Sequence, residues 1–269
     1  MKGRVLIIAG SDSGGGAGIQ GDIKTVTTLG GYAMTAITAL TAQNTLGVFG
    51  VHPVPVDFIA QQMVLCLEDI EADAIKTGML HSAEVIETVA RHLPAGVPLV
   101  VDPVMVAKGG SPLLAAEALS ALKKLLLPRA AVITPNLPEA ALLLGRSIGE
   151  SSEEMVRAAE ALLQFGSGAV LLKGGHGSGE MLTDVLLARD ASPILLQTPR
   201  IETRHTHGTG CTFASAIATG LAQGMGLEDA VRRGHGYVQA AIANAPGLGQ
   251  GHGPLGHAAA GAQVAGNTP

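Results

Sequence analysis

The chain has 269 residues, of which 47% are hydrophobic, 14% are charged and 2% are aromatic, and its formal net charge is −5. This composition supplies ample core and excludes disorder over most of the chain, while the absence of a basic stripe argues against nucleic acid as a partner. No targeting signal and no membrane-length apolar run is visible, and two distant cysteines fit a reducing compartment, so we expect a cytoplasmic protein without a membrane partner.

Short apolar runs alternate along the chain with longer segments of helical periodicity. Strands are expected at Arg4–Gly10, Ala33–Leu40, Ala72–Thr77, Pro98–Val101, Ala131–Thr134 and Ala169–Lys173. Helices are expected at Ile19–Leu29, Asp57–Asp69, Ala83–His92, Pro112–Leu127, Pro138–Leu144, Glu153–Gln164 and Thr209–Gln223. Two later runs, Met181–Leu187 and Ile194–Pro199, predict an antiparallel hairpin. The alternation predicts a mostly parallel sheet with helices on both faces.

The domain organisation follows from the absence of repeats and of Pro- or Ser-rich linkers. We expect a single domain over residues 1–257 and a flexible tail, rich in Gly and Ala, over residues 258–269. Because ligands bind beyond the carboxyl ends of strands in such sheets, the loops after the strands mark the site. These loops are Gly10–Gly16, Gln43–Asn44, Lys76–Met79, Asp102–Val106, Asn136–Glu139 and Lys173–His176.

The segment His205–Thr212, with the sequence HTHGTGCT, is the most informative stretch of the chain. Its glycines lead directly into the apolar run Phe213–Leu221, so backbone N–H groups are expected to point outward at the positive end of a helix dipole. Such a turn favours an anion, and we expect it to lower the pKa of the Cys211 thiol. The pattern indicates phosphoryl transfer, and the alternative is a tight turn with a small buried cysteine.

Of two common nucleotide-binding motifs, one is present only in part and the other is absent. The loop after the first strand contains Gly16-x-Gly18-x-x-Gly21, which has the form of a dinucleotide fingerprint. No acidic residue occurs between Ile23 and Val56 to hold a ribose, so hydride transfer is disfavoured. The phosphate loop GxxxxGK[ST] is absent from the sequence, which excludes that class of phosphotransferase.

Polar residues at other strand ends each have a functional and a structural interpretation. Asn136 and Glu139 form a good helix start by themselves, yet at a strand end they could arrange water around Mg²⁺. Lys173 could be an ordinary solvated lysine, and Asp102 could begin a turn. Gln43 could be an exposed amide, although its donor and acceptor match a ring nitrogen beside an exocyclic amine.

Seven segments occur together in the order IAGSDSGGGAGIQ, TALTAQNT, KTGML, DPVMVAKGG, VITPNLPEA, LLKGGH and HTHGTGCT. In order and spacing they resemble the hydroxymethylpyrimidine/phosphomethylpyrimidine kinases of thiamine biosynthesis, which belong to the ribokinase superfamily. The resemblance extends from about Val5 to at least Leu221, and GYVQAAI resembles the family's C-terminal helix. It implies a ribokinase-like three-layer α/β/α sandwich with a mostly parallel central sheet.

The resemblance also implies an activity and a set of residues. The family transfers the γ-phosphoryl group of ATP, with Mg²⁺, to 4-amino-5-hydroxymethyl-2-methylpyrimidine and then to the resulting monophosphate. It implies a pyrimidine pocket formed by Gly10, Gln43, Met79 and Val106. It implies an anion hole formed by Gly208, Thr209, Gly210 and Cys211, in which Cys211 replaces the catalytic aspartate of sugar kinases. It assigns Asn136 and Glu139 to Mg²⁺ and phosphate, with Asp102 as a further metal candidate, and Lys173 to the ATP phosphates.

Three alternatives stay open at this point. A pyridoxine/pyridoxal/pyridoxamine kinase acts on a similar flat ring with a hydroxymethyl arm, and it differs in the groups at the ring edge. A non-catalytic ligand sensor and a dinucleotide-dependent oxidoreductase are the alternatives from other classes.

Relatives are commonly dimeric, so we expect a homodimer with Tyr32–Val56 as a candidate interface, although a buried core segment explains this stretch as well.

Overall fold

The computed structural model describes residues 2–105, 116–175 and 179–266. Within these ranges, nine strands form one sheet in the order β3-β2-β1-β4-β5-β6-β7-β8-β9. The pairs from β2 to β7 are parallel, whereas β3 runs antiparallel to β2, and β8 runs antiparallel to both β7 and β9. The strands are β1 (Arg4–Asp12), β2 (Tyr32–Asn44), β3 (Gly47–Pro53), β4 (Ala74–Thr77), β5 (Leu99–Val101), β6 (Val132–Ile133), β7 (Ala169–Leu172), β8 (Met181–Ala188) and β9 (Ile194–Pro199).

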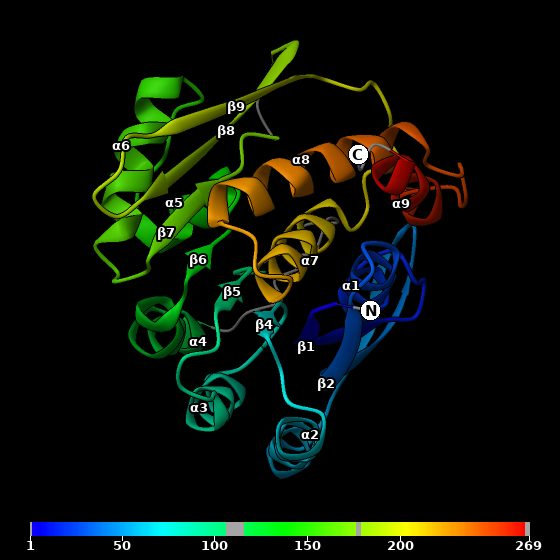
Figure 1. Ribbon diagram of the computed structural model, residues 1–269, viewed down its shortest axis with the longest axis vertical. Helices are drawn as coiled ribbons and strands as arrows, with labels where there is room; N and C mark the ends of the chain where they lie inside the picture. Colours follow the sequence, from blue (N-terminus) through cyan, green and yellow to red (C-terminus); the bar gives the residue numbers. More distant parts are fainter. Residues whose placement is uncertain (1, 106–115, 176–178, 267–269) are drawn as a thin grey trace.

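Helices cover both faces of the sheet, as Figure 1 shows. One face carries α1 (Gly18–Thr28), α7 (Thr209–Ala222) and α8 (Leu227–Ala243). The other carries α2 (Val56–Asp69), α3 (Ala83–His92), α4 (Ala116–Ala121), α5 (Leu137–Leu144) and α6 (Ser152–Leu163). The predicted three-layer α/β/α sandwich is confirmed. No helix within the described ranges has the length and apolar character required to cross a membrane.

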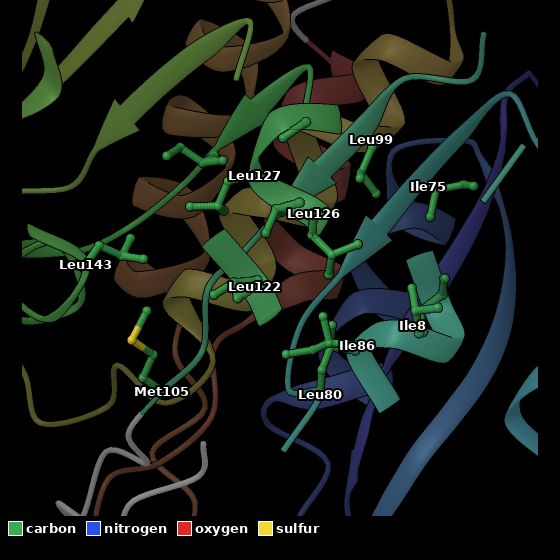
Figure 2. Close-up of a cluster of buried hydrophobic side chains, with 14 of the residues drawn as sticks. Ile8, Ile75, Leu80, Ile86, Leu99, Met105, Leu122, Leu126, Leu127 and Leu143 are labelled. Atoms are coloured by element: carbon green, nitrogen blue, oxygen red, sulfur yellow. The ribbon is translucent and has the colours of Figure 1, made fainter. Parts of the chain in front are cut away.

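The alternation of side chains along β1 explains the two cores. Val5 and Ile7 pack under α1 and α7, whereas Leu6 and Ile8 point to the opposite face, and all four are fully buried. Figure 2 shows the second core, where Ile8 lies among side chains from the strands and from the helices of that face. A parallel sheet buried on both faces requires such continuous apolar strands.

Two elements differ from the prediction, namely the edge strand β3 and the helix that includes α4. β3 was not expected, because its two glycines and mostly exposed residues hide the alternation of a buried strand. The helix expected at Pro112–Leu127 is described only from Ala116, where α4 continues into a π-helical turn, Leu122–Leu126, and a 3-10 turn, Leu127–Arg129. Residues 106–115 lie outside the described part of the chain.

The C-terminal segment is helical where we expected a flexible tail. Helix α9 (His257–Gly266) packs against α1 and α8, and Ala260 is fully buried. The side chain of His257 contacts the first turn of α7, with Nε2 3.0 Å from Thr212 Oγ1. The prediction was wrong for residues 258–266 because small side chains, such as Gly261 against Thr28, allow close helix packing.

Candidate active site

A cavity of about 450 Å³ opens where the loops after the parallel strands meet the start of α7. The structure brings together in its lining the predicted residues Gly10, Gln43, Met79, Asp102, Asn136, Glu139, Lys173, Gly208, Thr209, Gly210 and Cys211. Val106, the remaining predicted residue, lies outside the described residues. Loops separated widely in sequence therefore form one site, as the strand-end rule predicts.

The start of α7 has the geometry of an anion-binding turn. Gly208 adopts a left-handed conformation with φ +88°, and a Cβ there would overlap the carbonyl oxygen of Gly16, so only glycine fits. The first intrahelical bond is donated by Thr212 N to Gly208 O at 2.9 Å. The N–H groups of Gly210 and Cys211 precede that bond, so they have no partner within the helix, and both residues line the cavity.

The Cys211 thiol differs from the prediction. Burial raises its pKa to about 12, and the opposing effects of the nearby Lys76 ammonium and of the Gly18 N–H do not compensate. The expectation of a lowered pKa considered the helix N-terminus alone and was wrong, because desolvation of the thiolate is the larger effect here. At neutral pH the side chain is a neutral thiol.

Lys173 lies beside this turn and is held by acidic groups. Its Nζ donates to Asp102 Oδ1 at 3.1 Å, and the same oxygen accepts a bond from Thr134 Oγ1 at 2.9 Å. Burial opposes the charge, yet the carboxylates of Asp102 and Glu139 raise the pKa of Lys173. A Cβ on Gly210 would lie 3.2 Å from Lys173 Nζ. The lysine is therefore a fixed positive charge next to the N–H groups of α7, and not a solvated side chain.

Asn136 and Glu139 form the helix start expected from the sequence and also lie in the wall of the cavity. They form a reciprocal capping box at α5, with Glu139 N to Asn136 Oδ1 and Asn136 N to Glu139 Oε2 both at 2.9 Å. Both also line the cavity. Burial raises the pKa of Glu139 to about 7, with Lys173 acting in the opposite direction. Within the described ranges, no group of three or more His, Cys, Asp or Glu side chains is arranged to hold a metal.

Gly10, Gln43 and Met79, the described residues that the resemblance assigns to a ring pocket, line the cavity on its β1 and β2 side. A Cβ on Gly10 would lie 3.2 Å from Met79 Sδ, so the glycine leaves space beside the thioether. Thr38 Oγ1 donates to the Met79 carbonyl at 2.7 Å and holds this loop. The Gln43 carboxamide lies 3.2 Å from Thr41 Oγ1 and 3.3 Å from His207 Nε2.

Two pairs of interacting side chains were not predicted from the sequence. Asp12 Oδ2 and His207 Nε2 lie at hydrogen-bond distance, 2.8 Å apart, on the cavity wall. Behind Cys211, Lys76 Nζ donates to both carboxylate oxygens of Asp22, at 2.9 and 2.8 Å, and both side chains are fully buried. Lys76 lies near the end of β4 and His207 precedes Gly208, so their positions were visible in the sequence, but nothing there identified their acidic partners.

Comparisons with known proteins agree with this geometry. A family model described as phosphomethylpyrimidine kinase matches residues 12–256. A hydroxymethylpyrimidine/phosphomethylpyrimidine kinase from Haemophilus influenzae is 49% identical over 260 residues, which cover 94% of this chain and 96% of that protein. A thiamine biosynthesis bifunctional protein from Geobacter sulfurreducens is 52% identical over 95% of this chain, which spans only 52% of that longer protein.

Solved structures of similar proteins include two related kinases. A phosphomethylpyrimidine kinase from Clostridium difficile has a TM-score of 0.78 and 42% identity, covering 90% of this chain and 100% of that one. A pyridoxal kinase from Bacillus subtilis, in an ADP complex, has a TM-score of 0.88 and 37% identity, covering 96% and 98% of the two chains. The two enzymes act on different rings, so fold similarity does not distinguish the substrates.

Proposed function

Because the chain belongs to the phosphomethylpyrimidine kinase family, we propose that its cavity binds 4-amino-5-hydroxymethyl-2-methylpyrimidine and phosphorylates it twice. The chain is a phosphotransferase of thiamine biosynthesis and uses ATP. What we propose beyond this is the identity of the substrate and the two successive phosphorylations. The second activity of the bifunctional relative belongs to that longer protein.

One observation carries the proposal. The free N–H groups at the start of α7, the ammonium of Lys173 and the carboxamide of Gln43 line the same cavity. The first two groups suit a migrating phosphoryl group, because they stabilise negative charge without rearranging. The third suits the edge of an aminopyrimidine. A site with both features favours phosphoryl transfer to a small heteroaromatic alcohol.

The chain's own residues would act mainly by position and charge. In a loose phosphoryl-transfer transition state, negative charge is spread over peripheral oxygens, so donors fixed in advance are more useful than a strong base. The N–H groups of Gly210 and Cys211 would hold the transferred group, and Lys173 would neutralise its charge. Lys173 is preorganised for this role by its contact with Asp102 at 3.1 Å.

The residues beside Lys173 fit a magnesium ion. Mg²⁺ is usually held by one or two carboxylates, with water and phosphate oxygens completing its shell, so a cluster of three protein ligands is not required. Glu139 and Asp102 supply two buried carboxyl groups in the cavity lining, and Asn136 adds an amide. We assign Mg²⁺ to Glu139, through water, with Asp102 as a second ligand. When bound there, the ion supplies charge neutralisation for the ATP phosphates.

The second candidate function is pyridoxal kinase activity, which the similar fold of the Bacillus subtilis pyridoxal kinase favours. An aminopyrimidine presents an amine beside a ring nitrogen, whereas pyridoxal presents a phenolic oxygen. Gln43 offers a carbonyl oxygen and an N–H side by side, which match the amine and the ring nitrogen of an aminopyrimidine together, whereas the phenolic oxygen of pyridoxal matches only one of them. We therefore favour the pyrimidine.

A comparison of kcat/KM on the two alcohols tests the assignment. The purified chain, with ATP and Mg²⁺, is expected to form ADP with the aminopyrimidine at least tenfold more efficiently than with pyridoxal, and ³¹P NMR should detect the monophosphate before the diphosphate. A preference for pyridoxal would establish the second candidate. Tight pyrimidine binding without ADP formation would indicate a sensor and refute kinase activity.

We also propose a homodimer in the cytosol. The edge strand β3 and its surroundings expose large apolar side chains, with Phe49 71%, Leu46 61% and Phe58 54% exposed. An unpaired edge with exposed apolar residues suits a second copy of the chain. Light scattering should give the mass of a dimer for the wild type and of a monomer for Phe49→Asp. The free thiols of Cys66 and Cys211 suit a reducing compartment.

A further inference from the structure

Asp12 and His207 line the cavity and join two of its loops. The Asp12 carboxylate is 3% exposed and accepts backbone N–H bonds from Gly14 at 2.8 Å, Gly16 at 3.0 Å and Ala17 at 2.8 Å. Its Oδ2 also lies 2.8 Å from His207 Nε2. The pair therefore connects the turn after β1 to the residue that immediately precedes Gly208.

The chemistry of the carboxylate determines where the His207 proton lies. Burial acts to raise the pKa of Asp12, but the bonds from His207 and from the Ala17 N–H outweigh it and lower that pKa. A carboxylate that accepts three backbone N–H bonds is ionised and has no proton to donate. His207 Nε2 must therefore be the protonated nitrogen that donates to Asp12.

This proton decides the orientation of the Gln43 carboxamide. Gln43 Nε2 lies 3.3 Å from His207 Nε2, and Gln43 Oε1 lies 3.2 Å from Thr41 Oγ1. In that orientation, two N–H donors face each other at His207. The single proton of Thr41 would also have two acceptors, because Thr41 Oγ1 already donates to Ser11 O at 2.9 Å. Exchanging the amide oxygen and nitrogen lets Gln43 Nε2 donate to Thr41 Oγ1, and it replaces the donor–donor contact at His207 with an amide oxygen that shares the Nε2–H with Asp12.

We propose that His207, held by Asp12, is a specificity-determining residue that locks the Gln43 carboxamide with its oxygen toward the imidazole and its nitrogen toward Thr41. The proposal rests on the pyrimidine kinase function and names the residue that sets its ring selectivity. In the locked orientation, Gln43 keeps one oxygen lone pair and one N–H for a ligand. The oxygen accepts from an exocyclic amine, and the N–H donates to the neighbouring ring nitrogen.

The opposite orientation would reverse this pattern along the ring edge. The amide N–H would then face the exocyclic amine, and a phenolic oxygen would be accepted in its place. A free amide could present either orientation, so it would discriminate poorly between an aminopyrimidine and a pyridine alcohol. His207 thereby acts through Gln43, as a positioning residue that need not contact the ring.

A double-mutant cycle tests the proposal. We expect His207→Ala to lower the ratio of kcat/KM for the aminopyrimidine to that for pyridoxal by about tenfold, mainly through KM, which corresponds to the loss of one hydrogen bond. His207→Gln, which restores an N–H donor, should recover part of the ratio. In a Gln43→Ala background, His207→Ala should change the ratio no further, because nothing remains to be oriented.

His205→Ala is the matched control in the same segment, since His205 does not line the cavity and its Nδ1 has no hydrogen-bond partner in the described structure. We expect this variant to keep the wild-type ratio. Parallel losses on both substrates in His207→Ala, or a persistent effect in the Gln43→Ala background, would overturn the proposal and indicate a role in holding the turns. A wild type inactive on the pyrimidine would instead refute the proposed function.

A measurement on the wild type avoids any failure of the variants to fold. Two-dimensional ¹⁵N NMR of the imidazole nitrogens should show a proton on His207 Nε2 in the ligand-free protein. A neutral His207 that carries its proton only on Nδ1 would overturn the argument, because Nε2 would then accept from Gln43 and favour the opposite amide orientation.

Discussion

The neutral state of the Cys211 thiol leads to a quantitative prediction for its alkylation by iodoacetamide. With a pKa of about 12, the thiolate fraction at pH 8 is about 10⁻⁴, whereas an ordinary cysteine with a pKa near 8.5 is about one quarter ionised. The more basic thiolate is about 40-fold more nucleophilic, because reactivity rises with pKa with a coefficient of about 0.45. The two effects together predict alkylation about 60-fold slower than that of a peptide cysteine.

Mass spectrometry of the Cys211 peptide measures this rate in a Cys66→Ser variant, which leaves a single reactive position. Limited access would also slow the reaction, so the pH dependence is the decisive readout. For a raised pKa, the rate should increase tenfold for each pH unit from 7 to 10. A rate that levels off below pH 9 would refute the reasoning from burial and restore the expectation of an activated thiolate.

The same property bears on catalysis. A lowered pKa would make Cys211 a base for the hydroxyl group in the first phosphorylation, and it would be dispensable for the anionic monophosphate in the second. A neutral thiol cannot accept that proton, so Cys211→Ala should reduce kcat/KM of both steps by a similar factor. A loss confined to the first step would show that the thiolate forms when substrates bind.

Three further predictions concern ionisable side chains in the core and in the cavity. Lys173→Met should lower kcat by ~10²-fold or more in both steps, and a change confined to KM would contradict a role in the transition state. Asp22→Asn leaves the buried Lys76 without its carboxylate and should lower the free energy of unfolding in urea by about 3–5 kcal/mol; a loss below ~1 kcal/mol would contradict this. Burial lowers the pKa of His257 from 6.5 to about 4, so the unfolded chain binds the proton more readily and the wild type loses stability as pH falls through this window. His257→Gln should therefore gain stability relative to the wild type from pH 6.5 to 4, by at most ~3 kcal/mol, and a difference independent of pH would oppose this.

The sequence predicted the sheet, and the meeting of the candidate residues at one cavity, because both depend on local patterns. Apolar runs identify strands that are buried on both faces, and the polar residue after each run lies at the ligand edge. With the helix start at Cys211, this rule was sufficient to predict that Gln43, Lys173 and Cys211 would meet, and all three line one cavity. The helix start at Asn136 and Glu139 was likewise predictable, because a capping box is a local motif.

What the sequence could not predict depends on tertiary context. The pKa of Cys211 is set by the burial that surrounding elements impose, and this outweighs the local helix start. The partners of Lys76 and His207 are Asp22 and Asp12, which lie in other elements of the fold. Helix α9 has no strong amphipathic pattern, so its order comes from contacts with α1 and α8.

The late position of α7 in the chain has a consequence for synthesis on the ribosome. This helix covers β1, β4 and β5 at the centre of the sheet (Figure 1), and His207 meets Asp12 across 195 residues of sequence. A nascent chain that has formed these central strands therefore keeps one apolar face open until its last quarter has emerged. We expect such intermediates to need chaperone protection, and substrate cannot rescue them, because its binding site does not yet exist.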